Sequence, residues 1–288
     1  MNAARDALLE RITAWAGSRN DVRGALLVGS AARSVSPADE HSDLDVVLFV
    51  TEPRAWLDEA SWVREIGDPW VTFIEPTGVG HGWERRVLFA DGVDVDFSLF
   101  PPPDASDEAA IAARHIHGVL QRGARALADP EGFLATMLDE ARAAPPVLRA
   151  ETPSAAELAN LVGDLLYHVV WTARKALRGE GWVAAECING HMAPNLARLA
   201  TWHAVVVNGV TDTWHAGRFL ERWADPRAVS GLARSLTDTT PQRMGEALAA
   251  CLELCELLAG ELGPPIGQPY PTDAHRRVAA WLREHPIA

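Results

Sequence analysis

The N-terminal part of the chain consists of short apolar runs separated by polar turns. Residues 24–29 and 44–50 are largely aliphatic, and residues 92–100 alternate between apolar and polar positions. Runs of this length and period predict β-strands. Two further strands are expected at residues 70–75 and 86–89, and the turn Ala90-Asp91-Gly92 predicts a hairpin after the second of them.

Apolar residues at helical spacing begin the chain and dominate its second half. Leu8, Ile12 and Trp15 predict a helix over residues 3–16, and a short helix is expected at residues 55–64. The later helices are expected at residues 108–122, 130–142, 155–178, 183–207, 241–262 and 272–284. This order predicts a small α/β domain over residues 1–135 and a helical domain over residues 136–288.

Length and composition agree with two domains. A chain of 288 residues is long for a single core, and 48% hydrophobic with 23% charged residues is typical of a globular protein. No apolar run approaches the roughly 18 residues of a membrane span, and the amphipathic N-terminus does not resemble a signal peptide. We therefore expect a cytoplasmic protein without a membrane partner.

The formal net charge of −13 disfavours a nucleic-acid partner, because such proteins present a basic face. An acidic protein suits a cationic ligand or divalent ions, although acidity more often serves solubility. The three cysteines Cys187, Cys251 and Cys255 are odd in number and do not predict a disulfide framework. Their spacing favours buried packing, so zinc is not indicated.

Two aspartates one residue apart stand at the start of the strand at residues 44–50. Asp43 and Asp45 face the same side of an extended chain and repel each other unless a cation neutralises them. Oxygen-only ligands favour Mg²⁺ or Mn²⁺ over zinc. Asp94 and Asp96 form a second such pair, which alone is more typical of a strand end. If the two strands are neighbours, these carboxylates converge as a two-metal site for phosphoryl or nucleotidyl transfer requires.

Gly29-Ser30 supplies a second element of such a site. A glycine in a tight turn after a strand lets backbone N–H groups and a hydroxyl approach a phosphate closely. The dipeptide alone is uninformative, but Asp43 follows Ser30 by thirteen residues, and the combination is specific.

Together these residues resemble the signature of the nucleotidyltransferase superfamily: Gly-Ser, a loop, Asp-x-Asp and a third aspartate on a later strand. Within it the chain most resembles the aminoglycoside 6-adenylyltransferases, the streptomycin-modifying group. The supporting stretches are residues 68–76, 88–99 and 270–282. The similarity spans nearly the whole chain and is looser in the helical middle.

The resemblance implies a nucleotidyltransferase domain with a mixed sheet, followed by an all-α helical bundle. It also implies transfer of AMP from ATP to a hydroxyl of a cationic aminoglycoside, with release of pyrophosphate. Asp43 and Asp45 would bind two Mg²⁺ ions, and Asp96 would be the third ligand or the base that takes the hydroxyl proton. The expected nucleotide-binding residues of this domain are Gly29, Ser30, Arg33 and Ser42. We expect a monomer.

Two positions depart from the family pattern. Ala31 stands where the family commonly has an arginine directly after Gly-Ser, and Arg33 is expected to take over the phosphate contact. Asp94 stands where the family often has a basic or polar residue. It is therefore predicted either to bind a cationic acceptor or to face solvent.

The helical domain is expected to complete both substrate sites. Lys175 is the only lysine of the chain and resembles an Ala-Lys element of the family, so it is predicted either to bind the triphosphate or to be a solvated residue. Asp164, Trp182 and Glu186 are predicted acceptor-binding residues, because carboxylates and an indole suit a polycation; packing is the alternative for Trp182. Three histidines of this domain are expected to lie in the core or on the surface and to take no part in catalysis: His168, His191 and His203.

Three other functions share parts of this pattern. The acceptor could be another small molecule, such as a lincosamide, or a protein hydroxyl. A non-catalytic nucleotide-binding member would not need all of Asp43, Asp45 and Asp96. RNA-directed nucleotide addition conflicts with the net charge of −13.

Overall fold

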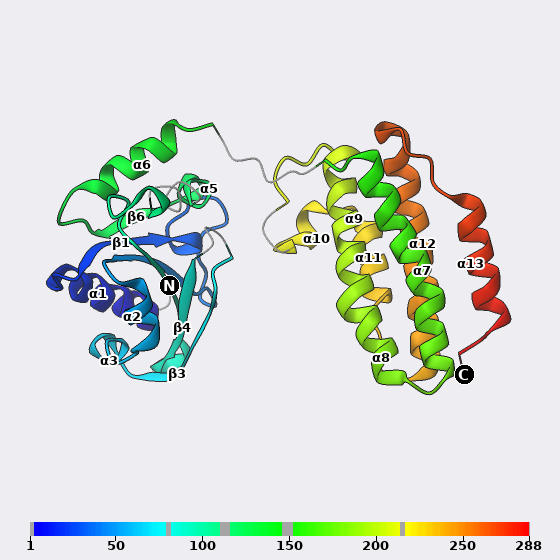
Figure 1. The fold of residues 1–288 in the computed structure, drawn as a ribbon, viewed down its shortest axis with the longest axis horizontal. Coiled ribbons are helices and arrows are strands. Elements are labelled where there is room, and N and C mark those ends of the chain that lie inside the picture. The colour runs from blue at the N-terminus through cyan, green and yellow to red at the C-terminus, as the bar shows by residue number, and fades with distance from the viewer. Residues whose placement is uncertain (1–2, 79–81, 110–115, 146–151, 214–216, 288) are drawn as a thin grey trace. The chain divides into compact units, whose positions relative to one another are not determined.

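The chain forms two compact units, Met1–Val147 and Leu148–Ala288, in a computed structural model that describes residues 3–78, 82–109, 116–145, 152–213 and 217–287 (Figure 1). The boundary between the two units lies between residues 147 and 148, whereas the sequence predicted a domain boundary after residue 135. Helix α6 (Phe133–Ala143) belongs to the first unit, because its Leu134 and Met137 pack against Leu26 of the sheet.

Unit 1 is built on a mixed six-stranded sheet, as expected. The strand order is β3-β4-β5-β2-β1-β6, in which β2 and β5 are parallel and the other neighbours are antiparallel. The strands are β1 Val22–Val28, β2 Leu44–Val50, β3 Pro69–Pro76, β4 Trp83–Phe89, β5 Asp94–Phe100 and β6 Arg125–Ala128. The predicted hairpin is β4–β5, joined by the 3₁₀ turn Ala90–Gly92.

The two faces of the sheet bury separate apolar clusters. On one face Leu48 and Phe97 pack with α1 (Ala3–Ser18). On the other face Phe49 and Phe100 pack with α6 and with α5 (His117–Arg122). Because side chains alternate along a strand, Asp45 of β2 and Asp96 of β5 belong to this second face. They lie toward the N-terminal ends of their strands, whereas the residues that pack with α5 and α6 lie at the C-terminal ends.

The prediction of a single helix at residues 55–64 is wrong. Two short helices replace it, α2 Pro53–Asp58 and α3 Val63–Ile66. Between them Trp62 turns into the core, where it stacks on Trp15 at 5.4 Å and meets Phe97 edge-on at 5.1 Å. Burying this indole interrupts the helix.

The region after β5 also differs from its prediction. Within the helix expected at residues 108–122, the structure describes helical residues up to 109 and then α5, and residues 110–115 lie outside the described part. The short strand β6 was not predicted. It pairs with β1 at the edge of the sheet.

Unit 2 is the expected helical bundle. Its elements are α7 Ala155–Leu177, α8 Gly181–Glu186, the π-helix η3 Cys187–Met192, α9 Ala193–Val206, α10 Leu220–Trp223, α11 Pro226–Arg234, α12 Pro241–Ile266 and α13 Thr272–Glu284. Helices α10 and α11 were not predicted. The core includes Leu196, Leu248 and Leu258, all fully buried. No helix in the described ranges has the length and apolar character needed to cross a membrane.

The three cysteines are free and buried in this bundle, which agrees with the expected packing role. Burial raises the pKa of Cys251 to about 11 and that of Cys255 to about 12, so both thiols are inert at neutral pH.

The helix expected at residues 183–207 is interrupted by the π-helix η3. A π-turn widens the helix and rotates the side chains that follow it relative to a continuous α-helix. Residue His191 lies within η3, so its direction cannot be derived from α-helical periodicity.

Candidate active site

Three aspartates converge where β2 and β5 run side by side. The parallel register sets Asp45 directly opposite Asp96, and Asp43 lies just before β2. One ligand oxygen from each of the three carboxylates lies within 4.8 Å of the others. The strand pairing on which the predicted metal site depends is therefore present, and its oxygen-only donors fit Mg²⁺.

The Gly29-Ser30 turn lies against the same carboxylates. Gly29 follows β1 with φ of +67°, and a Cβ at this position would overlap Asp45 Oδ2. Ser30 is 7% exposed, and its Oγ is buried without a hydrogen-bond partner in the described protein. A buried hydroxyl left without a partner is unfavourable unless a ligand supplies one. The turn thus combines close backbone approach with an available donor, as a phosphate site requires.

Arg86 is a component of the site that the sequence reading missed. It lies opposite Asp96 in the β4–β5 hairpin, and its Nε is 2.7 Å from Asp96 Oδ1. Its other guanidinium nitrogens lie 3.3 Å from Asp94 Oδ2 and 3.2 Å from Glu75 Oε1. Asp94 therefore has a cationic partner within its own domain. Counting the register back from the Ala90–Gly92 turn would have placed Arg86 beside Asp96.

Burial and like charge make Asp96 a weak acid in the metal-free protein. Burial is the main cause, Arg86 opposes it, and Asp94, Asp45 and Asp43 add to it, which together raise the pKa of Asp96 to about 7. A bound cation would favour the ionised carboxylate instead.

Glu84 is a second residue that the sequence reading missed. Burial, followed by the charge of Asp96, raises the pKa of Glu84 to about 7, although Ser98 Oγ donates a hydrogen bond to its Oε2 over 3.3 Å. Two neighbouring carboxyl groups therefore hold protons near neutral pH.

The loop that carries Arg33 and Ser42 is braced by its own polar side chains. Arg33 Nε donates to the Ser36 carbonyl over 2.8 Å, and Ser42 Oγ donates to Asp39 Oδ1 over 2.9 Å. These contacts fix the connection between the Gly-Ser turn and β2. The nucleotide-binding roles of both residues remain predictions.

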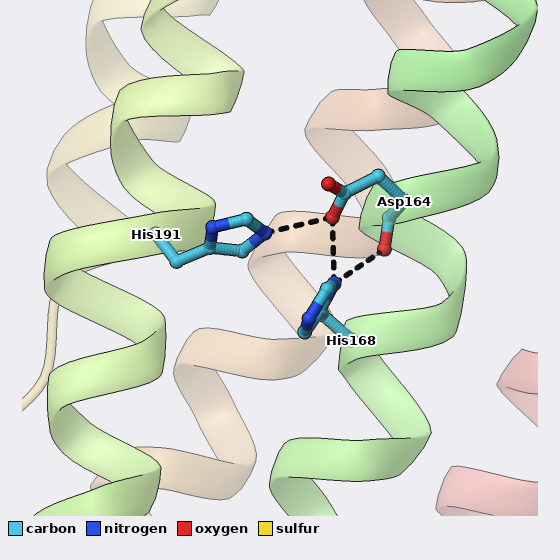
Figure 2. A group of neighbouring side chains, drawn as sticks. All are labelled: Asp164, His168 and His191. Atoms are coloured by element: carbon cyan, nitrogen blue, oxygen red, sulfur yellow. Dashed lines mark hydrogen bonds and ion pairs between the residues drawn. The ribbon is translucent and has the colours of Figure 1, made fainter.

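The predicted residues of the helical unit do not gather at one point. Asp164 and Lys175 both lie on α7, but eleven residues at about 1.5 Å each separate them by roughly 16 Å. Lys175 Nζ donates to Glu180 Oε2 over 2.9 Å and lies 5.3 Å from the Trp171 ring centroid. Asp164 instead contacts two histidines (Figure 2).

Trp182 and Glu186 are both exposed on the short helix α8, where their four-residue spacing places them on one face. Trp182 is 76% exposed, so core packing, the alternative considered for it, is wrong. An exposed indole and carboxylate one turn apart are available to a ligand.

Comparison with known proteins gives consistent matches. The sequence model of the family described as streptomycin adenylyltransferase matches residues 3–285. Aminoglycoside 6-adenylyltransferase of Bacillus subtilis (strain 168) is 21% identical over 257 residues, which are 87% of either chain.

Two solved structures also align with the chain. A crystal structure of an aminoglycoside 6-adenyltransferase from Bacillus subtilis aligns over 100% of both chains, with 16% identity and a TM-score of 0.45. A nucleotidyltransferase-like protein from Exiguobacterium sibiricum aligns over 92% of this chain and 78% of its own, with 14% identity and a TM-score of 0.34.

Proposed function

The chain belongs to the streptomycin adenylyltransferase family and is a nucleotidyltransferase, and we propose that it transfers AMP from ATP to a hydroxyl of a streptomycin-type aminoglycoside, releasing pyrophosphate. The observation that supports the chemistry most directly is the convergence of Asp43, Asp45 and Asp96 beside the Gly29-Ser30 turn. The family match over residues 3–285 supports the acceptor class.

In this proposal Asp43, Asp45 and Asp96 hold two Mg²⁺ ions, which would neutralise the phosphate charge and align the reacting groups. Gly29 allows backbone N–H groups to approach the triphosphate, and Ser30 Oγ donates to a phosphate oxygen. Arg33 and Ser42 extend this contact from the loop, and Lys175 of the helical unit is a further candidate for the triphosphate.

Asp96 has a second role open to it, as the base that accepts the proton of the acceptor hydroxyl. A general base must be ionised to accept a proton, and the bound Mg²⁺ ions would favour the ionised form of Asp96. Arg86 Nε lies 2.7 Å from Asp96 Oδ1, so the guanidinium orients this carboxylate and forms an ion pair with it when it is ionised.

The acceptor contacts are proposed for Asp94, Asp164, Trp182 and Glu186. An aminoglycoside carries several ammonium groups on a hydroxyl-rich frame, so carboxylates and an exposed indole face complement it. The net charge of −13 favours the approach of such a polycation.

The proposal is tested by incubating the protein with ATP, Mg²⁺ and a panel of aminoglycosides while pyrophosphate release is measured. Streptomycin-dependent release is expected. The Asp45→Asn variant should reduce the turnover number at least about 1,000-fold, because several kcal/mol of transition-state stabilisation depend on the metal ligands. Asp58→Asn is the matched control, since Asp58 is an exposed aspartate of the same unit that pairs with Arg54.

Each outcome selects between the alternatives. Release with a lincosamide or a protein hydroxyl, but with no aminoglycoside, would change the acceptor and keep the chemistry. Undiminished release by Asp45→Asn would refute the metal site. Nucleotide binding without release for any acceptor would favour a non-catalytic member.

A further inference from the structure

A second group of metal-ligating side chains lies in the helical unit. Asp164 and His168 are four residues apart on α7, and His191 comes from the π-helix η3. Figure 2 shows both imidazole rings directed at one carboxylate oxygen: Asp164 Oδ1 lies 2.6 Å from His168 Nδ1 and 2.8 Å from His191 Nε2. The centroids of the two rings are 4.3 Å apart. One nitrogen of each ring and one oxygen of Asp164 lie within 4.8 Å of one another.

The backbone around this cluster is unusual in a way that is independent of its side chains. Helix α7 brings Asp164 and His168 together by ordinary i, i+4 spacing. His191 depends on the six residues Cys187–Met192 that form a π-helix between α8 and α9. π-helical turns are rare and occur frequently at functional sites. The only described π-helix of this chain supplies the third ligand.

A second cluster in the same unit shows the contrasting, structural arrangement. His203, Asp225 and Glu261 also have ligand atoms within 4.8 Å of one another. There Arg227 already supplies the cation: it lies 2.8 Å from Asp225 Oδ2 and 2.7 Å from Glu261 Oε1. In the described ranges the ion pairs of Asp164 are with His168 and His191, and neither arginine nor lysine takes part.

The donor set determines the kind of ion. Two imidazole nitrogens with one carboxylate oxygen are ligands typical of Zn²⁺ and neighbouring transition metals, whereas Mg²⁺ prefers oxygen alone. The side chains of His168, Asp164 and His191 are 25%, 28% and 42% exposed, so an ion could enter and water could fill its remaining positions. With bond lengths of about 2.0–2.2 Å in a tetrahedral site the donor atoms lie roughly 3.4 Å apart, so Asp164 Oδ1 would have to move away from the two ring nitrogens, which now lie 2.6 and 2.8 Å from it.

We propose that Asp164, His168 and His191 bind one Zn²⁺-type ion, separate from the Mg²⁺ site of the three aspartates; this assigns Asp164 to the ion in place of the acceptor contact proposed for it above. The ion takes the place of the direct contacts of Asp164 Oδ1 with the two rings, and it links α7 to η3. Because all three ligands come from unit 2, the site does not depend on how the two units are arranged.

The test measures metal binding directly and therefore does not depend on turnover or on the acceptor. Full-length protein without an affinity tag is treated with chelator and titrated with Zn²⁺ by calorimetry in excess Mg²⁺, which occupies the aspartate site. Co²⁺ replaces Zn²⁺ in a parallel titration followed by its visible absorption. One tight site per chain is expected, with a Co²⁺ spectrum of nitrogen and oxygen ligands.

Variants assign the ligands. His168→Gln and His191→Gln should each weaken Zn²⁺ binding at least about 100-fold, since loss of even a supporting residue of a metal site costs roughly 10- to 100-fold. His285→Gln is the matched control, because His285 is an exposed histidine of the same unit whose Nδ1 lies 2.9 Å from the Trp281 carbonyl and whose ring stacks on Trp281. Asp45→Asn is the control for the Mg²⁺ site. Circular dichroism verifies that each variant is folded. His191→Gln is the variant expected to disturb the fold least, because His191 is the most exposed of the three ligands.

Four results would overturn the proposal. Equal Zn²⁺ affinity in the wild type, His168→Gln and His191→Gln would exclude these ligands. Loss of binding in Asp45→Asn would assign the ion to the aspartates, and a thiolate charge-transfer band would assign it to a cysteine. If no tight site is found and the histidine variants raise only the KM for an aminoglycoside, the cluster is an acceptor contact.

Discussion

Gly29 is restricted by two separate requirements at the active site. Its φ of +67° lies in the left-handed region, which a residue with a Cβ enters at a cost of about 1–2 kcal/mol. In addition, a Cβ would overlap Asp45 Oδ2, so the side chain of a metal ligand would have to move. The backbone of the phosphate turn and the position of a carboxylate are thus set together.

Gly29→Ala should therefore lower both the stability and the activity of the protein. Gly132→Ala is its matched control, because Gly132 has φ of +75° and open space around its Cβ position. We expect Gly132→Ala to cost about 1 kcal/mol of unfolding free energy and to leave Mg²⁺ affinity unchanged. Gly29→Ala should cost more and weaken Mg²⁺ binding, as measured by urea unfolding and calorimetry. Equal effects on Mg²⁺ affinity would contradict the close contact with Asp45.

Asp96 makes the stability of the metal-free protein depend on pH. Its pKa is about 7 in the folded state against 3.8 in the unfolded chain, so the folded state holds the proton more tightly. The stability from this group is complete below pH 3.8 and is lost as the pH rises to about 7. A shift of this size corresponds to at most about 4 kcal/mol.

Urea unfolding with chelator at pH 5 and pH 8 measures this loss. Asp96→Asn should show a smaller decrease in unfolding free energy over this interval than the wild type, and its removal should also lower the pKa of Glu84. Mg²⁺ should restore wild-type stability at pH 8. The same decrease in both proteins would show that Asp96 does not bind the proton.

At the scale of elements, local patterns predicted most of the segments that build the two cores. Strand β2 was recognised from its apolar, β-branched run, strand β5 from its alternation, and the long helices α7 and α12 from helical periodicity. Strand β6 was missed because Arg125–Ala128 has no β-branched residue, and it exists because the edge of β1 offers a partner. Periodicity could not show the π-helix either, since η3 spans only the six residues Cys187–Met192 and continues directly into α9.

The same limit applies to the two clusters of titratable residues. Asp43, Asp45 and Asp96 were predicted because their spacing relates to strand geometry and to a known signature. Arg86 and Glu84 required the register of the β4–β5 hairpin. His168 and His191 are separated by 23 positions and meet only through the packing of η3 on α7, so nothing local could connect them.

At the scale of the whole molecule, each unit has its own core. The clusters around Leu48 and Phe49 lie in unit 1, and the cluster around Leu196 lies in unit 2. Each unit therefore contains the apolar packing that a separate domain needs.

Leu196→Ala should lower the unfolding free energy of the helical unit by about 2–5 kcal/mol, because it leaves a cavity in a fully buried position. Mg²⁺ affinity should not change, since the three aspartates lie in unit 1. Leu48→Ala, an equally buried leucine of β2, is the comparison and should weaken Mg²⁺ binding as well. Equal loss of Mg²⁺ affinity in both variants would show that the cores are not independent.

The alternation of side chains along β2 also determines where the protein can accept the insertion or deletion of a single residue. Asp45, Val47 and Phe49 share one face of the strand, and their neighbours share the other. Deleting a single codon between Val46 and Val50 would exchange the two faces beyond the deletion and turn apolar side chains out of both clusters. A codon lost or gained in the polar loop at residues 31–42 leaves this parity intact. The fold of the sheet is therefore expected to accept insertions and deletions in the loop, away from Arg33 and Ser42, and to reject them in the strand that follows it.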